Sequence, residues 1–158
     1  DIKLKEEKLI SKKLKNFLVL RLGTIYGFSE GIRFHTAVNK FCFNASIKEK
    51  ITVYKTALHQ YRPYLSLRDA FKVFKFSIDK NFFKNDIYNV LSDNYTVFQI
   101  LNKIRKHHKK IEIQFIKTEI MNQLSYHVSK KKLKDVGLNL QSNIDKDISD
   151  TIKLLSNI

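Results

Sequence analysis

The sequence predicts a mixed α/β fold built from short strands, with no internal repeat and no linker. A continuous apolar run over residues 17–22 is typical of a strand that is buried on both faces, and it leads into a loop that contains Gly23 and Gly27. Beyond this loop, segments with apolar residues at helical spacing alternate with short strand-like segments. A buried parallel strand that ends in a glycine loop usually brings that loop to a ligand crevice at the carboxyl edge of a sheet.

The composition limits the class of protein. A chain of 158 residues is long enough for one domain core, and 43% hydrophobic residues is ordinary for a globular protein. The sequence has no apolar run as long as a membrane span and no signal peptide, so no membrane partner is expected. Cys42 is the only cysteine, which excludes an internal disulfide and indicates a cytoplasmic protein. Because the chain opens in helical sequence without a methionine, we expect a fragment or a processed piece.

The net charge of +15 raises the question of a nucleic-acid partner. Most of the basic residues are lysines spread along the whole chain, whereas base readout depends mainly on arginine. Single-strand binding needs aromatic side chains in a basic groove, and most aromatic residues here have the spacing of core residues. We therefore expect non-specific attraction to polyanions and no specific nucleic-acid partner.

The first elements are a helix, a strand and a glycine loop. Residues 2–14 carry apolar side chains on one broad face, which predicts a helix. After a tight turn at residues 15–16, the apolar run over residues 17–22 predicts the strand. This order is that of the second half of a βαβ crossover. The parallel neighbours of the strand must come from sequence outside this chain, from another chain, or from later residues.

The middle of the chain predicts one helix and two extended segments. Apolar residues at helical spacing over residues 34–45 predict the helix, with Cys42 packed as a small hydrophobe. Alternation at residues 51–54 predicts a short strand. Residues 61–67 are predicted to be extended, and Pro63 is expected to keep this segment away from the centre of a sheet.

The last part of the chain is predicted to contain four helices and two strands. Asp69 is expected to cap the first of these helices, over residues 69–78, which should bury Ala70, Phe71, Val73, Phe74 and Ile78. The remaining elements are strands at residues 87–91 and 111–116, a helix capped by Thr96, a short helix capped by Ser129 and ended by Gly137, and a final helix opened by Ser142-x-x-Asp145.

Three segments, with a weaker fourth, resemble one enzyme family in order and spacing. They are Lys3-Leu4-Lys5-Glu6-Glu7-Lys8-Leu9, Arg21-Leu22-Gly23-Thr24-Ile25-Tyr26-Gly27, Arg62-Pro63-Tyr64-Leu65-Ser66-Leu67-Arg68-Asp69-Ala70 and Ser129-Lys130-x-x-Leu133-x-x-x-Gly137-Leu138. Together they resemble the carboxyl-terminal half of an extended short-chain dehydrogenase/reductase, in the nucleotide-sugar epimerase and dehydratase family. The resemblance covers nearly the whole chain.

The resemblance implies a division of the chain and a missing part. Residues 1–33 would end a dinucleotide-binding Rossmann domain, and residues 34–158 would form a nucleotide-sugar-binding lobe with elements that return to the Rossmann sheet. The family's catalytic Tyr and its Gly-rich fingerprint would fall before the first residue, so a missing amino-terminal half would bind most of the NAD or NADP. The isolated fragment is then expected to be inactive, and the helix with Lys3 is expected to form a homodimer.

The resemblance implies that Lys3 is both a catalytic and a cofactor-binding residue. In this family a Tyr phenolate acts as the base in a transient oxidation of the sugar, and its pKa must fall well below ~10 to work near neutrality. A neighbouring Lys ammonium lowers that pKa and holds the nicotinamide ribose. The alternative is that Lys3 is one more surface lysine.

Further positions are implied to bind the nucleotide-sugar. Arg62 would hold the diphosphate through a bidentate guanidinium, unless it is only an exposed edge-strand arginine. Tyr54 would stack on the base, although a core tyrosine in a strand is nearly as good an interpretation. Phe34 and His35 fall near the family's substrate loop, and His35 could equally be an exposed or capping histidine.

Other positions depart from the family's pattern. Thr24 replaces the usual Asn, but its hydroxyl can still bind a sugar or a phosphate. Asn122 and Gln123 lie where the family often has a second diphosphate-binding Arg, and they are polar stand-ins at most. His107 and His108 suit a helix end and lack carboxylate or Cys partners, so no metal site is expected.

Two other functions stay open on the sequence. One is a non-catalytic fragment that binds a nucleotide or a protein partner. The other is a basic module that binds polyanions.

Overall fold

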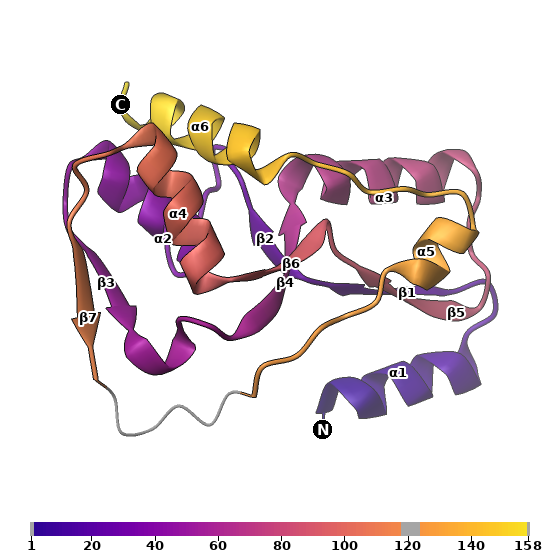
Figure 1. The fold of residues 1–158 in the computed structure, drawn as a ribbon. Coiled ribbons are helices and arrows are strands. Elements are labelled where there is room, and N and C mark those ends of the chain that lie inside the picture. Colours follow the sequence, from indigo (N-terminus) through magenta and orange to yellow (C-terminus); the bar gives the residue numbers. More distant parts are fainter. Residues whose placement is uncertain (1, 118–123, 158) are drawn as a thin grey trace.

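The computed structural model describes residues 2–117 and 124–157 and contains fourteen short elements in those ranges (Figure 1). In chain order they are α1 (Ile2–Lys13), β1 (Leu18–Leu22), β2 (Thr24–Tyr26), α2 (Ala37–Ser46), β3 (Ile51–Tyr54), a 3₁₀ turn (Lys55–Ala57), β4 (Tyr61–Ser66), α3 (Leu67–Asp79), β5 (Asp86–Val90), β6 (Asp93–Thr96), α4 (Val97–His107), β7 (Ile113–Ile116), α5 (Lys131–Asp135) and α6 (Ile144–Leu155). The predicted α/β class is therefore confirmed. In the described part of the chain, no helix is long and apolar enough to cross a membrane.

The strand β1 finds its parallel neighbour later in the same chain. It pairs with β5 in a register that runs from Leu18 opposite Asp86 to Leu22 opposite Val90. Helix α3 lies on one side of this pair and α1 lies on the other (Figure 1). The expectation that this strand is buried on both faces is wrong for this chain. Leu22 is 41% exposed, because among the described strands only β5 pairs with β1.

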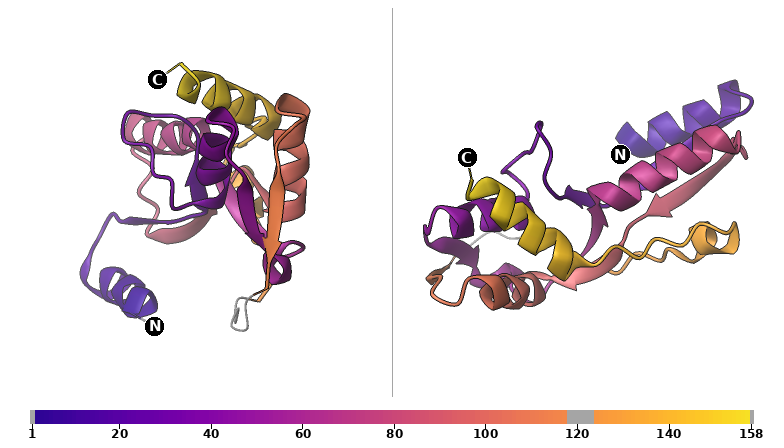
Figure 2. Two further views of the ribbon diagram at one scale, coloured as in Figure 1. Left: turned by 90° about the vertical axis from the view of Figure 1, so that its left-hand side faces the viewer. Right: turned by 90° about the horizontal axis from the view of Figure 1, so that it is seen from above.

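Helix α1 touches the rest of the molecule sparsely. It has no buried residue, and it stands off from the other helices in the side view (Figure 2). A bidentate ion pair connects it to β1, since Nε and Nη2 of Arg21 lie 2.8 and 2.5 Å from the two carboxylate oxygens of Glu7. Most of the apolar side chains of α1 are therefore left in solvent, among them Ile2, Leu4 and Leu9.

The second sheet has the order β2–β4–β6, so β4 is the central strand and the prediction for Pro63 is wrong. The reason lies in how the two ladders overlap. Strand β2 pairs with residues 64–66 of β4, whereas β6 pairs with residues 61–64. Pro63 therefore has a strand on one side only, and its missing N–H interrupts no ladder on the other side.

Two hydrophobic cores sit at the two ends of the molecule. The larger is built by α2, α4 and α6 with β3, and it contains the fully buried Cys42, Ile104 and Ile148. Burial raises the pKa of the Cys42 thiol to about 12, which agrees with its predicted role as a packed hydrophobe. The smaller core lies between α3, the β1–β5 pair and α5, and contains Val73 and Leu133.

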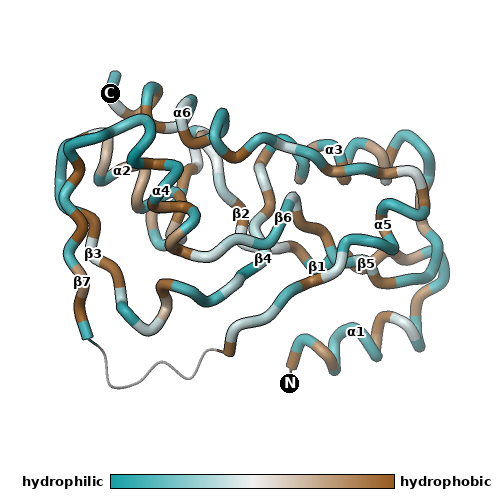
Figure 3. Tube along the Cα trace, viewed as in Figure 1, coloured by the Kyte–Doolittle hydropathy of each residue, from teal (hydrophilic) through white to brown (hydrophobic). Residues whose placement is uncertain are grey.

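Helix α3 has an unexpected second apolar face. Ala70 and Val73 are buried as predicted, but the predicted burial of three larger residues is wrong, since their exposed fractions are 67% for Phe71, 47% for Phe74 and 73% for Ile78. With Leu67 these three recur every three or four residues along the helix, and we call the four residues the outward seam; Figure 3 shows the hydrophobic residues along α3. The helix therefore has one face for its own core and one that this chain leaves uncovered.

Side chains cap the starts of α3, α4 and α6, not always at the predicted residue. Helix α5 has Lys130 at its N-cap position without a side-chain cap, so the predicted cap at Ser129 is wrong. Thr96 caps α4 in a full capping box with Gln99, as predicted. Helix α6 begins after Asn143, whose side chain accepts from two backbone N–H groups, so the predicted start at Ser142 is wrong. The backbone N–H of Ser142 instead donates to the buried carboxylate of Asp69, 3.0 Å away. That carboxylate does not cap α3, because the Ser66 side chain does.

Candidate functional site

A cavity of about 510 Å³ lies at the open edge of β2. Its walls come from β2, from the loop over residues 27–36 and from the first turn of α2. Thr24 and His35, which the sequence placed in a substrate site, both line it. The full lining is Thr24, Ile25, Gly27, Ser29, Gly31, Ile32, Arg33, His35, Thr36, Asn39 and Leu67.

The glycine after β2 makes the turn into this loop. Gly27 has φ of +121°, in the region that side chains disfavour, and a Cβ at this position would lie 3.3 Å from the Cβ of Leu67. Its N–H donates to Oδ1 of Asn39 at 3.0 Å, and Nδ2 of Asn39 donates to the carbonyl of Arg33 at 3.1 Å. One side chain therefore fastens both ends of the turn to α2.

The first turn of α2 faces the cavity without a side-chain cap. Thr36 has extended backbone at the N-cap position, but its hydroxyl makes no cap bond, and Oγ1 is buried with no hydrogen-bond partner in the described residues. Helix N-termini present backbone N–H groups and a partial positive charge, so they favour anions. Arg33 and His35, both exposed, stand beside this helix start on the cavity wall. The cavity therefore gathers donors and positive charge suited to a phosphate.

Arg62 shares a strand face with Thr24. In the β2–β4 register Thr24 lies opposite Tyr64, and side chains two residues apart along a strand point to the same face. Arg62 precedes Tyr64 by two residues, so it projects from the same face of the ladder as Thr24. It is not among the residues that line the 510 Å³ cavity.

The guanidinium of Arg62 binds neighbouring chain segments. Nη1 donates to the carbonyls of Tyr61 and Leu124 at 2.7 and 2.8 Å, and Nη2 donates to Oε1 of Gln60 at 2.9 Å. The Tyr126 ring centroid lies 5.1 Å from the guanidinium carbon. Arg62 thus fastens residues 124–126 against β4, whatever else it binds.

Three other predicted site residues, Phe34, Tyr54 and Lys3, do not line the cavity. Phe34 packs on Phe43, with ring centroids 4.5 Å apart. Tyr54 is the last residue of β3 and is 46% exposed. Lys3 is in the first turn of α1, and its Nζ lies 2.8 Å from a carboxylate oxygen of Glu6. Asn122 and Gln123 lie outside the described residues.

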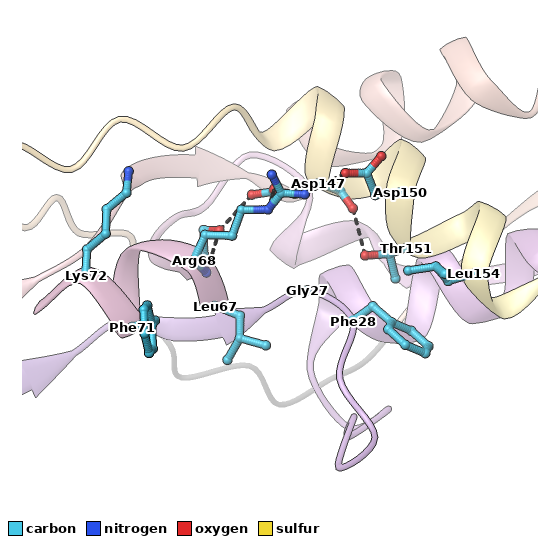
Figure 4. Close-up of a pocket in the computed structure, with 11 residues that line it drawn as sticks. Gly27, Phe28, Leu67, Arg68, Phe71, Lys72, Asp147, Asp150, Thr151 and Leu154 are labelled. Atoms are coloured by element: carbon cyan, nitrogen blue, oxygen red, sulfur yellow. Dashed lines mark hydrogen bonds and ion pairs between the residues drawn. The ribbon is translucent and has the colours of Figure 1, made fainter. Parts of the chain in front are cut away.

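A second cavity, of about 660 Å³, lies between α3 and α6, and the sequence did not predict it (Figure 4). It shares Gly27 and Leu67 with the first cavity. Arg68 points toward the acidic side chains of α6, with Nε 3.4 Å from Asp147 and Nη2 2.7 Å from Asp150 (Figure 4). These ion pairs join α3 to α6. Because the cationic and acidic side chains neutralise one another, this cavity offers little free charge to a ligand.

Sequence reasoning missed most of the residues that line the first cavity, among them Arg33, Thr36 and Asn39. The N-cap position of Thr36 was hidden because the predicted helix began at residue 34, whereas α2 begins at Ala37. No pattern pointed to Asn39, because its two partners are backbone groups that only the folded loop brings near it.

Several solved structures with this fold are nucleotide-sugar epimerases or dehydratases. UDP-glucose 4-epimerase of Thermus thermophilus, in complex with NAD, matches 96% of this chain and 50% of its own, with a TM-score of 0.79 and 20% identity. dTDP-glucose 4,6-dehydratase of Bacillus anthracis, also with NAD, matches 98% of this chain and 49% of its own, with a TM-score of 0.79 and 14% identity. A UDP-glucuronic acid 4-epimerase mutant of Bacillus cereus, bound to a UDP-deoxyfluoroglucuronic acid and NAD, matches 94% and 49%, with a TM-score of 0.77 and 15% identity.

The chain therefore has the fold of about half of a nucleotide-sugar epimerase or dehydratase chain, which confirms at the level of the fold the resemblance drawn from the motifs. It spans about half the length of each of these proteins. No protein-family model matches the sequence, and no curated protein matches it.

Proposed function

We propose that the chain is the nucleotide-sugar-binding half of an NAD(P)-dependent epimerase or dehydratase that acts by transient oxidation of the sugar. One observation carries this proposal: Thr24, Arg33 and His35 meet the uncapped start of α2 in one cavity. A diphosphate needs its charge offset where it leaves water, and these groups supply a guanidinium, an imidazole, a hydroxyl and helix N–H donors. Arg62, which projects from the same face of the β2–β4 ladder as Thr24, would contact the other end of the diphosphate. Tyr54, at the end of β3, would stack on the base.

A second, dinucleotide-binding half would complete the enzyme. Residues 1–33 would belong to it, and residues 34–158 would form the sugar-binding lobe, from which β5 returns to pair with β1. Two features support such a partner. The edge of β1 opposite β5 is unpaired among the described strands, and the outward seam leaves large apolar side chains in water. Strand β1 would then become an inner strand of a larger parallel sheet.

Lys3 is the residue of this chain that we assign to the cofactor. NAD supplies hydride transfer when it is bound, and that chemistry needs a base for the sugar hydroxyl. The hydrogen bond to Glu6 and the charge of Glu6 raise the pKa of Lys3, so its ammonium stays charged at neutral pH. Such a cation would stabilise a neighbouring phenolate supplied by the other half. The exposed apolar residues of α1 would serve a homodimer of the complete enzyme.

Calorimetric titration tests the proposal directly. The isolated chain should bind UDP, because its phosphate-binding groups are all present, and it should bind NAD weakly because the Gly-rich loop is not in this sequence. Uridine serves as the control ligand, since it lacks the diphosphate. Equal affinity for uridine and UDP, or no binding of UDP at millimolar concentration, would contradict the proposed phosphate site.

A further inference from the structure

The side chain of Asn39 is buried and polar, and it holds the cavity loop to helix α2. Asn39 is only 5% exposed, although it sits in the first turn of a helix where a polar side chain usually reaches solvent or a cap. Its carboxamide instead accepts from the N–H of Gly27 and donates to the carbonyl of Arg33. The loop between these two residues is thereby closed by a single side chain.

The two partners of Asn39 require a carboxamide. One partner is a donor and the other is an acceptor, so the side chain must offer an acceptor and a donor on neighbouring atoms. An aspartate can accept from Gly27, but its carboxylate cannot donate to the Arg33 carbonyl. An alanine can do neither and leaves both backbone groups without this partner. The position is therefore specific in chemistry as well as in size.

The segment that Asn39 holds leads directly to two side chains of the cavity wall. Arg33 is the residue whose carbonyl is held, and His35 follows two residues later. Both line the cavity with Thr24 and with the start of α2, on which Asn39 itself sits. We propose that Asn39 is a positioning residue, which fixes this loop so that Arg33, His35 and the helix start meet one phosphate-bearing ligand. This inference rests on the proposed function, because it assigns the same cavity to a nucleoside diphosphate.

The physical effect is preorganisation. A loop that is already fixed loses little conformational freedom when the ligand binds, whereas a loose loop loses it at that moment and the affinity falls. Because its amide is shielded from water, Asn39 competes well with solvent for the two backbone groups. Loss of the carboxamide should therefore weaken ligand binding even where the protein stays folded.

The test compares Asn39→Ala with a matched control in the same helix. Asn44 is also in α2, and its Nδ2 donates to the carbonyl of Lys50 at 2.9 Å, away from the cavity. UDP titrations well below the melting temperature of each variant separate binding from stability. Asn39→Ala should raise the Kd for UDP about tenfold, the scale of a partly lost preorganisation, whereas Asn44→Ala should leave it within about twofold. Equal Kd values for Asn39→Ala and wild type would overturn the inference.

Hydrogen exchange gives a second readout that needs no ligand. In the wild type the Gly27 amide is bonded to a buried acceptor, so it should exchange at least about tenfold faster in Asn39→Ala and unchanged in Asn44→Ala. Unchanged exchange at Gly27 would also overturn the inference. If the wild type fails to bind UDP while Gly27 exchange accelerates, the proposed function fails and the loop-fixing role of Asn39 stands, but its link to UDP is lost.

Discussion

The hydroxyl of Ser66 donates a 2.7 Å hydrogen bond to Oδ2 of Asp147, and this buried contact joins residues 81 positions apart. Ser66 ends β4 and caps α3, whereas Asp147 is in the first turn of α6. The bond, with the ion pair from Arg68, therefore ties the helix beside the β1–β5 pair to the core of the other lobe. Asp147 is 6% exposed, so these partners replace the water that its carboxylate would otherwise bind.

Replacement of Asp147 should destabilise the protein. Asp147→Ala leaves Ser66 without its acceptor and should lower the free energy of unfolding by about 2–4 kcal/mol. The control is Asp150→Ala, because the Asp150 side chain is 36% exposed and pairs with the same Arg68. It should cost less than about 1 kcal/mol. Urea unfolding, monitored by circular dichroism, measures the free energy of unfolding of both variants. Equal losses of this free energy would contradict the role assigned to the Ser66–Asp147 hydrogen bond.

Asp69 should make stability depend on pH in acid. Burial alone raises the pKa of this fully buried carboxyl, but hydrogen bonds from the Ser92 hydroxyl, from Ser142 and from Lys72 outweigh burial and hold the pKa below its usual value. A depressed pKa in the folded state means that the stabilisation is fully present above the unfolded value of about 3.9 and is lost as the pH falls through the folded value.

The measurement is a melting series from neutral pH into acid. The melting temperature of the wild type should fall most steeply below about pH 4, where Asp69 takes up a proton in the unfolded chain before it does so in the folded protein. Asp69→Asn should be less stable at neutral pH and should show a shallower acid slope, since it has no such proton to bind. Parallel acid slopes in the two proteins would assign the acid sensitivity to other carboxylates.

The two arginines of the proposed substrate site should differ in what they contribute. Arg33→Ala should weaken UDP binding with little change in melting temperature, because Arg33 is exposed on the cavity wall. Arg62→Ala should weaken UDP binding by about 2–4 kcal/mol, and Arg62→Lys should restore part of it, since an ammonium cannot reproduce the bidentate fork. Arg62→Ala should also lower the melting temperature, since the bonds to Leu124 and Gln60 are lost.

Titration with UDP and thermal melting of the three variants separate these effects. In the completed enzyme, NAD affinity serves as the internal control and should not change in any of the three variants. If Arg62→Ala unfolds more readily but binds UDP as well as wild type does, Arg62 belongs to the structure alone and Arg33 is left as the phosphate-binding cation.

The outward seam should tolerate charge in the isolated chain. Phe71 is 67% exposed, so Phe71→Glu should change the free energy of unfolding by no more than about 0.5 kcal/mol. On the opposite face of the same helix Val73 is 1% exposed, and Val73→Ala should cost about 1–3 kcal/mol. Chemical denaturation measures both. A large loss in Phe71→Glu would mean that the isolated chain already covers this face, and the seam could then not receive a second half.

Much of the fold follows from local patterns. Helix α4 with its cap at Thr96 and the strands β3 and β1 each depend on neighbours a few residues away, and these elements were confirmed. The burial predicted for both faces of β1 was not. The predictions that failed needed distant partners. The Ser142 N–H binds Asp69 across 73 positions, and the cap of α6 is Asn143 in place of the predicted Ser142.

The sequence by itself determined the order of the elements apart from β2 and β6, the apolar stripes and the motif set that pointed to half of a nucleotide-sugar enzyme. Spacing along the chain is enough to define a helix face or a turn. Only the tertiary structure decided that Thr24 and His35 share a cavity, that Arg62 projects from the same strand face as Thr24, and that Asn39 closes the loop between Gly27 and Arg33. It also decided that Phe71, Phe74 and Ile78 of α3 face outward. The reason is that side-chain hydrogen bonds and burial depend on which backbone groups the folded chain brings together, and no periodicity records that.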